Sequence, residues 1–151
     1  MRFLPSVLYK LRRSWWSVAR PLTVGVRVFL IRDGSLLLVR HTYQDAWYLV
    51  GGGVEKGETL EQAIRREAAE EVGAELGDLA LFGVYSNFYE GKSDHVIVYT
   101  CTDFTLSGAS DREIERFVFC DLHALPEGTS PGTRRRVREY LEERPTSTGL
   151  W

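Results

Sequence analysis

The sequence predicts an α/β fold of the α+β type, in which helices cover a mixed β-sheet. The chain has 151 residues, the size of one domain, and its 44% hydrophobic and 26% charged residues are typical of a packed globular protein. Segments with strand-like patterns follow one another through short turns, as hairpins do, and segments with helical periodicity lie between and after them. Together these observations favour a single domain built around one sheet.

The composition also excludes several classes of protein. A formal net charge of −2 argues against a protein that coats nucleic acid, so we expect no stable nucleic-acid partner. Cys101 and Cys120 fit no metal or disulfide spacing, which indicates free thiols in a reducing, cytoplasmic compartment. No apolar run approaches the roughly 20 residues of a membrane-spanning helix.

Residues 1–20 differ from the rest of the chain because they carry five basic residues and no acidic one. Their apolar residues recur at spacings of three and four, which predicts an amphipathic helix. Such a helix packs on its own domain or on a second copy of the chain, or lies on a membrane surface; disorder is the other alternative. We therefore divide the chain into this segment and a domain over residues 21–151.

The domain begins with a predicted hairpin. Residues 22–31 and 35–41 are rich in β-branched and other apolar side chains, and the Arg-Asp-Gly sequence between them has glycine at a turn position. A short strand is expected next over residues 47–50. A glycine-rich loop over residues 51–57 then leads to a helix.

This helix is predicted from Thr59 to Val72. Thr59 is a good N-cap residue, and Gln62 three residues later completes a capping box, in which each residue bonds the other's backbone. Gly73 follows the last helical residue, where a left-handed conformation commonly ends a helix.

Three further strands and a last helix complete the predicted fold. The strands cover residues 80–89, 95–104 and 117–120, with a polar turn between the first two. The helix covers residues 133–143 and follows a Pro-Gly pair that suits a helix start.

The helix after the glycines carries three glutamates on one flank. Glu67, Glu70 and Glu71 lie at positions i, i+3 and i+4, and the helical period places Glu71 among the core-facing residues. Like charges at this spacing repel one another, and the negative end of the helix dipole adds to the cost. A divalent cation would offset this repulsion, and oxygen ligands select Mg²⁺ or Mn²⁺ over zinc. The alternative is an acidic helix face without function.

Mg²⁺ held by carboxylates usually binds phosphate groups as well. It neutralises phosphate charge and activates a water molecule for attack on phosphorus, while a further carboxylate takes or positions the proton. The sequence offers no P-loop for this chemistry, because Gly57 is followed by Glu-Thr rather than by lysine. The predicted reaction is therefore metal-assisted hydrolysis rather than the chemistry of a P-loop nucleotidase.

The stretch from Gly52 to Ala74 resembles the signature of the Nudix hydrolases. That signature fixes a glycine, a glutamate and the run Arg-Glu-x-x-Glu-Glu-x-Gly at set spacings. All seven fixed positions are matched in this chain, by Gly52, Glu58, Arg66, Glu67, Glu70, Glu71 and Gly73. The resemblance implies the Nudix fold, an α/β/α sandwich with a mixed sheet, and hydrolysis of a diphosphate linkage in a nucleoside diphosphate derivative or other nucleotide.

The resemblance also implies roles for individual residues. Glu67, Glu70 and Glu71 would be the catalytic residues and the ligands of Mg²⁺ or Mn²⁺, with the carbonyl of Gly52 as a further ligand.

Other roles concern the shape of the site. Glu58 and Arg66 would form a structural pair that fixes the loop against the helix, and Gly73 would end the helix. An additional acid on a later loop often completes such sites, and Glu113 and Glu115 are the candidates here.

Substrate recognition needs basic or aromatic groups near the metal. Arg40, near the end of the second predicted strand, is a candidate for binding phosphate, and Trp47 is a candidate for stacking on a base. The alternative for Trp47 is a place in the core.

We therefore expect a cytoplasmic, Mg²⁺-dependent pyrophosphohydrolase with a small-molecule nucleotide substrate. One alternative is an RNA 5′-end pyrophosphohydrolase, and another is a non-catalytic Nudix-like module that only binds nucleotides. A homodimer or a membrane-surface contact, if either forms, is expected through residues 1–20.

Overall fold

The computed structural model describes residues 22–89, 91–108 and 114–151. Its elements, in chain order, are β1 (Leu22–Arg32), β2 (Ser35–His41), β3 (Trp47–Tyr48), β4 (Val50–Gly53), α2 (Leu60–Val72), β5 (Ala74–Leu76), β6 (Ala80–Tyr89), β7 (Lys92–Cys101), β8 (Phe104–Leu106), β9 (Ile114–Asp121), α3 (Pro131–Leu141) and β10 (Ser147–Leu150). None of the helices in this part of the chain is both long enough and apolar enough to cross a membrane.

The main sheet is mixed and has β1 near its centre. Its strands follow the order β10-β6-β7-β1-β2-β3, with β4 paired to β1 and β9 paired to β2. β1 runs parallel to β7 and antiparallel to β2 and β4. A second, two-stranded sheet is made by β5 and β8.

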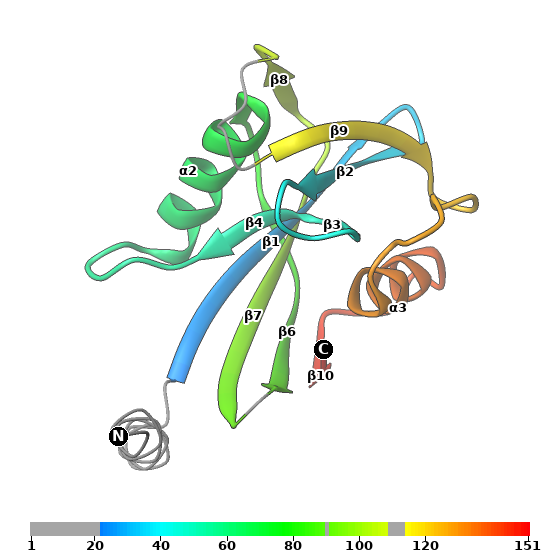
Figure 1. The fold of residues 1–151 in the computed structure, drawn as a ribbon. Helices are drawn as coiled ribbons and strands as arrows, with labels where there is room; N and C mark the ends of the chain where they lie inside the picture. Colours follow the sequence, from blue (N-terminus) through cyan, green and yellow to red (C-terminus); the bar gives the residue numbers. More distant parts are fainter. Residues whose placement is uncertain (1–21, 90, 109–113) are drawn as a thin grey trace, which may run out of the picture.

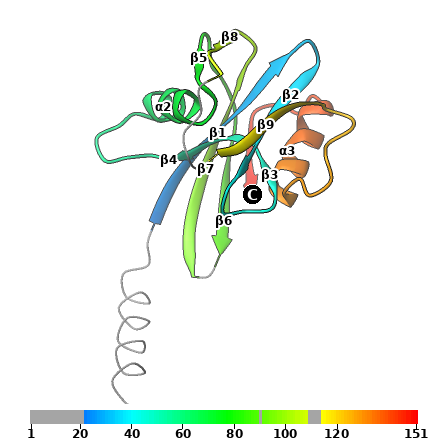
Figure 2. The same cartoon turned by 45° about the horizontal axis from the view of Figure 1, so that its top comes forward.

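The two helices cover opposite faces of the main sheet (Figures 1 and 2). The alternation of side chains along β1 explains this, because successive residues of a strand face opposite sides. Val26, Val28 and Leu30 pack with the buried side of α2 in one core cluster. Phe29 and Ile31 pack with Val137 of α3 in the other cluster. The predicted α/β/α sandwich with a mixed sheet is confirmed.

Several predicted elements are confirmed as well. The hairpin of β1 and β2 forms, with Asp33 and Gly34 both at positive φ in its turn. α2 has the predicted N-cap and capping box, and β6 has the predicted bounds.

The glycine-rich segment differs from its prediction. Residues 51–53 are not a loop, because Val50–Gly53 forms β4 and pairs with β1 from Gly25 to Val28. Strand propensity gives no signal here, since glycine has no side chain to pack. The pairing comes from the neighbouring strand and brings the glycine backbone beside α2.

The second half of the chain has more strands than predicted. The predicted strand over 95–104 is divided into β7 and β8, and β9 is longer than the predicted 117–120. β5 and β10 had no prediction, and α3 begins and ends two residues earlier than predicted. The predicted helical segment over residues 1–20, with its dimer and membrane contacts, lies outside the described residues.

Candidate active site

α2 is fixed at both ends, and this sets the direction of its side chains. At its start the Thr59 side chain accepts a hydrogen bond from the Gln62 backbone, and the Gln62 side chain accepts one from the Thr59 backbone. At its end Gly73 takes the left-handed conformation, with φ of 63°. Glu71 is therefore held among the buried residues of the helix, as its spacing predicts.

Gly52 and Glu67 are in close contact where β4 passes α2. A Cβ atom placed on Gly52 would lie 2.5 Å from the carboxylate carbon of Glu67. No side chain fits in that space without moving the carboxylate, because real Cβ atoms do not approach other atoms so closely. Gly52 thus allows the Glu67 carboxylate to lie against the β4 backbone.

Glu71 is the most buried of the three helix glutamates, with a side chain only 6% exposed. One carboxylate oxygen accepts a hydrogen bond from the Gly51 backbone N–H at 2.9 Å. The other lies 3.6 Å from Nε2 of His41, at the end of β2. The Glu71 carboxylate is thus aimed at β4 and β2 rather than at solvent.

Arg66 connects the acidic residues of the helix and the preceding loop. Its guanidinium makes two hydrogen bonds to the Glu58 carboxylate, at 2.7 and 3.0 Å, and a third to the Gly53 carbonyl at 3.0 Å. The same group contacts Glu67 at 2.8 Å and Glu70 at 3.3 Å. Arg66 thus pairs with Glu58 and also holds two of the helix glutamates.

These hydrogen bonds change the acidity of both partners. The bond from Arg66 lowers the pKa of the Glu58 carboxyl, and the Glu55 backbone N–H lowers it further. The hydrogen bond to Glu58 in turn raises the pKa of the Arg66 guanidinium above its usual value. Both groups are therefore ionised at neutral pH, and the loop is fixed to the helix by a charged pair.

The three glutamates are not gathered into one cluster. In the ranges that the structure describes, no group of three or more His, Cys, Asp or Glu side chains is close enough to hold a metal ion. The reason is that Arg66 holds Glu67 and Glu70, while Glu71 is bonded to Gly51. Arg66, one residue before Glu67 and four before Glu70, therefore supplies part of the positive charge that the spacing of the glutamates requires.

The donor set still fits a divalent cation. Glu67 lies against the Gly52 backbone in the space that glycine leaves free, and both residues line one cavity. The Glu70 side chain is 50% exposed, so it has room to turn from Arg66 toward a cation. Carboxylate and carbonyl oxygens are the ligands that hard cations such as Mg²⁺ and Mn²⁺ prefer.

A cavity of about 340 Å³ opens beside Glu67 and Glu71. We call it the acidic cavity; its walls include these two glutamates, the three glycines of β4 and the side chains of Arg27, His41, Tyr43 and Tyr48. Arg27 was not among the predicted site residues. An arginine inside the apolar run LTVGVRVFLI is nevertheless unusual, and this pattern could have indicated a functional role. The side chain of His41, at the end of β2, is only 11% exposed.

The structure places the predicted substrate-binding residues elsewhere. Trp47 is 7% exposed and belongs to the core cluster on the α3 side, with the Arg116 guanidinium 5.1 Å from its ring. Arg40 pairs with Glu115 at 3.1 Å and with Asp45 at 3.4 Å. Neither lines the acidic cavity.

Of the two candidates for the additional acid, only one can be placed. Glu115 lies on β9 and is paired with Arg40. Glu113 is outside the described residues.

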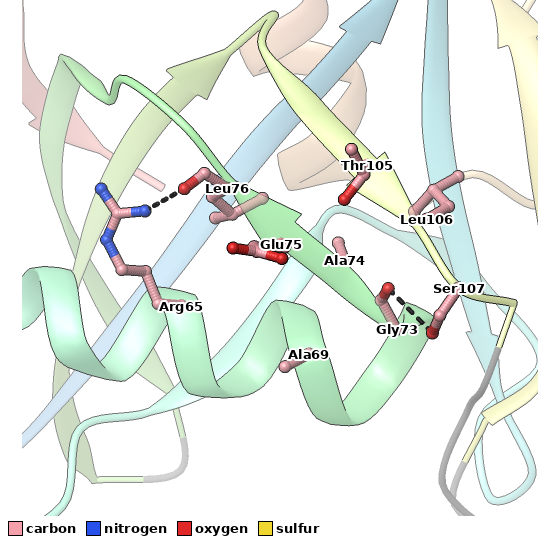
Figure 3. A pocket seen from close by; sticks show the side chains of 9 residues that line it. All are labelled: Arg65, Ala69, Gly73, Ala74, Glu75, Leu76, Thr105, Leu106 and Ser107. Atoms are coloured by element: carbon pink, nitrogen blue, oxygen red, sulfur yellow. Dashed lines mark hydrogen bonds between the residues drawn. The ribbon is translucent and has the colours of Figure 1, made fainter.

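A larger hollow, of about 670 Å³, lies on the other side of α2 (Figure 3). It is lined by the helix residues Arg65 and Ala69 and by residues of β5 and β8. Arg65 donates hydrogen bonds to the carbonyls of Leu76 and Gly77, so its charge holds β5 against the helix. None of the three helix glutamates lines this hollow, which separates it from the site.

Comparison with known families gives one match over most of the chain. The family model described as "NUDIX domain" matches residues 21–141.

Two groups of curated proteins are similar over shorter stretches. The "RNA pyrophosphohydrolase" of Hydrogenovibrio crunogenus is 42% identical over 60 residues, which are 40% of this chain and 36% of that protein. The "Nucleoside triphosphatase NudI" of Escherichia coli is 47% identical over 49 residues, which are 29% of this chain and 35% of that protein. The matches thus span about a third of the length of these relatives.

One of the similar solved structures is matched over nearly its whole length. The MutT NUDIX hydrolase from Burkholderia pseudomallei superimposes with a TM-score of 0.71 at 26% identity, over 78% of this chain and 97% of that one.

Proposed function

We propose a function on the premise that this chain belongs to the Nudix family, whose domain model matches residues 21–141. In this proposal the protein is a hydrolase that cleaves a diphosphate linkage in a nucleotide or nucleoside diphosphate derivative by attack of water at phosphorus. The observation that carries this proposal is the contact of the Glu67 carboxylate with the β4 backbone at Gly52, in a cavity that the buried Glu71 also lines.

The ligands of the cation would be the Glu67, Glu70 and Glu71 carboxylates and the Gly52 carbonyl. Mg²⁺ or Mn²⁺ held there would neutralise phosphate charge and acidify a bound water molecule. The Gly51 N–H holds Glu71 in place, and the Glu71 carboxylate would orient that water and receive its proton. Arg66 fixes the loop and Glu67, so that the oxygen ligands are held on a rigid helix.

The proposal is tested by replacing Glu71 with glutamine. Glu71→Gln keeps the size of the side chain but removes its charge, so kcat should fall by about two orders of magnitude or more. The thermal unfolding temperature should change little. The assay separates and quantifies the nucleotide products formed from a panel of nucleoside triphosphates, nucleotide sugars, ADP-ribose and dinucleoside polyphosphates with Mg²⁺ present, and EDTA should stop the reaction.

Glu75→Gln is the matched control, because Glu75 is an exposed glutamate on β5 outside the acidic cavity. It should keep wild-type turnover. Near-normal turnover of Glu71→Gln would refute the assignment, and binding of nucleotides without any turnover would favour a non-catalytic module.

A second substrate class is RNA with a 5′-triphosphate end. The observation in its favour is the similarity to the curated RNA pyrophosphohydrolases, which covers 40% of this chain in the Hydrogenovibrio crunogenus protein. A 5′-triphosphorylated oligonucleotide in the same panel distinguishes it from free nucleotides. The cytoplasmic location stays a prediction.

A further inference from the structure

Arg27 is a charged side chain in the middle of the apolar strand β1. Its neighbours Val26 and Val28 are completely buried, and Arg27 itself is partly buried. Ordering a long charged side chain inside a sheet is costly unless the charge meets partners. The free energy of placing Arg27 here therefore depends on what its guanidinium contacts.

The Arg27 guanidinium lies against the backbone of the site. Its Nη1 donates hydrogen bonds to the Val26 carbonyl at 2.7 Å and to the Gly52 carbonyl at 3.2 Å. The Gly52 carbonyl is also the backbone ligand proposed for the cation. One oxygen atom is thus shared between a side chain of fixed positive charge and the cation site.

Acidic side chains surround this guanidinium. Burial lowers the pKa of Arg27, while Glu71, Asp94 and Glu67 raise it. An arginine side chain stays protonated in proteins at neutral pH, so Arg27 brings a full positive charge to the site. That charge reduces the electrostatic repulsion among the carboxylates, as a bound cation would.

Arg27 also lies in the wall between two cavities. One is the acidic cavity, and the other is a hollow of about 320 Å³ that we call the hairpin cavity because Asn87, Tyr89 and Lys92 of the β6–β7 hairpin line it. Arg27, Gly52 and Gly53 line both. A group bound in either cavity would meet the guanidinium, whose fork of donors suits phosphate oxygens.

We propose that Arg27 is a substrate-binding residue whose guanidinium contacts a phosphate of the bound diphosphate and competes with the divalent cation for the Gly52 carbonyl. This inference rests on the proposed function, since it takes the substrate to be a diphosphate. Arg27 then makes the site selective, because the guanidinium opposes a cation that arrives alone and contributes a contact when a diphosphate arrives with it. A purely structural role, as counter-ion of Glu71 and Asp94, would provide no contact with the diphosphate.

Two binding measurements on Arg27→Gln separate these roles, and neither needs turnover. Titration calorimetry with Mn²⁺ alone should show about tenfold tighter binding than in the wild type, because a like charge is gone. Titration with methylenediphosphonate, a diphosphate whose bridging oxygen is replaced by CH₂, should show about tenfold weaker binding at saturating Mn²⁺.

Arg138→Gln is the matched control, since it removes an arginine charge from the exposed side of α3. It should leave both affinities unchanged. Arg27→Lys keeps the charge and loses the fork, so it should bind Mn²⁺ like the wild type and methylenediphosphonate more weakly. This variant also decides the phosphate contact if Arg27→Gln does not fold.

Mn²⁺ affinity that fails to rise in Arg27→Gln would overturn the competition, and wild-type affinity of either variant for methylenediphosphonate would overturn the phosphate contact. If the wild-type protein hydrolysed no substrate of the panel, that result would instead refute the proposed function. The two failures are therefore distinguishable.

Discussion

Gly52 determines how closely the strand and the helix of the site approach each other. Any side chain at this position would meet the Glu67 carboxylate, which is the mobile end of a flexible side chain. A methyl group at this position would therefore displace the Glu67 carboxylate, the proposed metal ligand, and would leave the backbone of β4 in place.

We expect Gly52→Ala to lower Mn²⁺ affinity and kcat by about tenfold or more, as a misplaced ligand does. The free energy of unfolding should stay within about 1 kcal/mol of the wild type, because the carboxylate can move away. Calorimetry with Mn²⁺ and urea unfolding measure the two effects.

Gly53→Ala is the control, since a Cβ there meets no atom within 4 Å. It should keep its Mn²⁺ affinity. If both alanine variants lost the cation equally, the contact of Gly52 with Glu67 would have no special role.

The residues of the Nudix signature could be identified from the sequence, but most of the other residues that line the acidic cavity could not. The pairing of Glu58 with Arg66 could be expected because a fixed pattern marks it. Arg27 and His41 come from β1 and β2, and only the sheet brings them beside Glu71. Trp47 was a candidate for stacking, but strand pairing directs it into the core.

α2 is the element that presents the acidic residues, and its N-terminus depends on the capping box. The Thr59 hydroxyl accepts a hydrogen bond from the Gln62 backbone at 3.1 Å, which satisfies one of the free N–H groups of the first turn. The buried residues of the helix then pack against β1 and β4.

Removing this cap should destabilise the protein. Thr59→Ala is expected to lower the free energy of unfolding by about 1 kcal/mol, measured by urea denaturation. Thr102→Ala, which replaces an exposed threonine in the bend between β7 and β8, should have a much smaller effect. Equal stabilities of the two variants would show that the cap contributes nothing.

Elements with strong local signals were predicted and those without them were not. The β1–β2 hairpin and α2 have turn or capping residues at both ends, and their bounds agree with the structure within a residue or so. β4 consists largely of glycine, and β5 and β8 have three residues each, so their pairing depends on contacts with distant segments.

The whole molecule is held together on the α3 side by a cluster around Tyr85. Its hydroxyl donates a hydrogen bond to Glu139 at 2.9 Å, and the guanidinium of Arg136 lies 3.7 Å from the centre of its ring. Arg136 also bonds the Leu150 carbonyl, which connects α3 to β10. The cluster therefore joins the last helix and the last strand to the sheet.

This cluster predicts a loss of stability in alkali. Burial, and then the hydrogen bond to Glu139, raise the pKa of Tyr85 to about 12 from an ordinary value of 10. The folded state thus favours the protonated phenol, and its contribution is complete below pH 10 and lost as the pH rises through 12. Urea unfolding of the wild type should show this decline.

In Tyr85→Phe the decline between pH 10 and pH 12 should be smaller, because there is no phenol to ionise. Tyr89→Phe, at a tyrosine that is 63% exposed, should keep the slope of the wild type. An unchanged slope in Tyr85→Phe would mean that other groups cause the alkaline loss.

The central place of β1 has a consequence for synthesis of the chain. Within its hairpin β1 shares only two residue pairs with β2, whereas nine residues of β1 pair with β7, where Leu22 meets Ser93. β4 can pair with one edge of β1 early, but in an emerging polypeptide the edge that faces β7 stays unpaired until residues up to Cys101 have left the ribosome. During that interval the segment depends on transient collapse or on chaperones, and premature termination before β7 leaves a product with a strong tendency to aggregate.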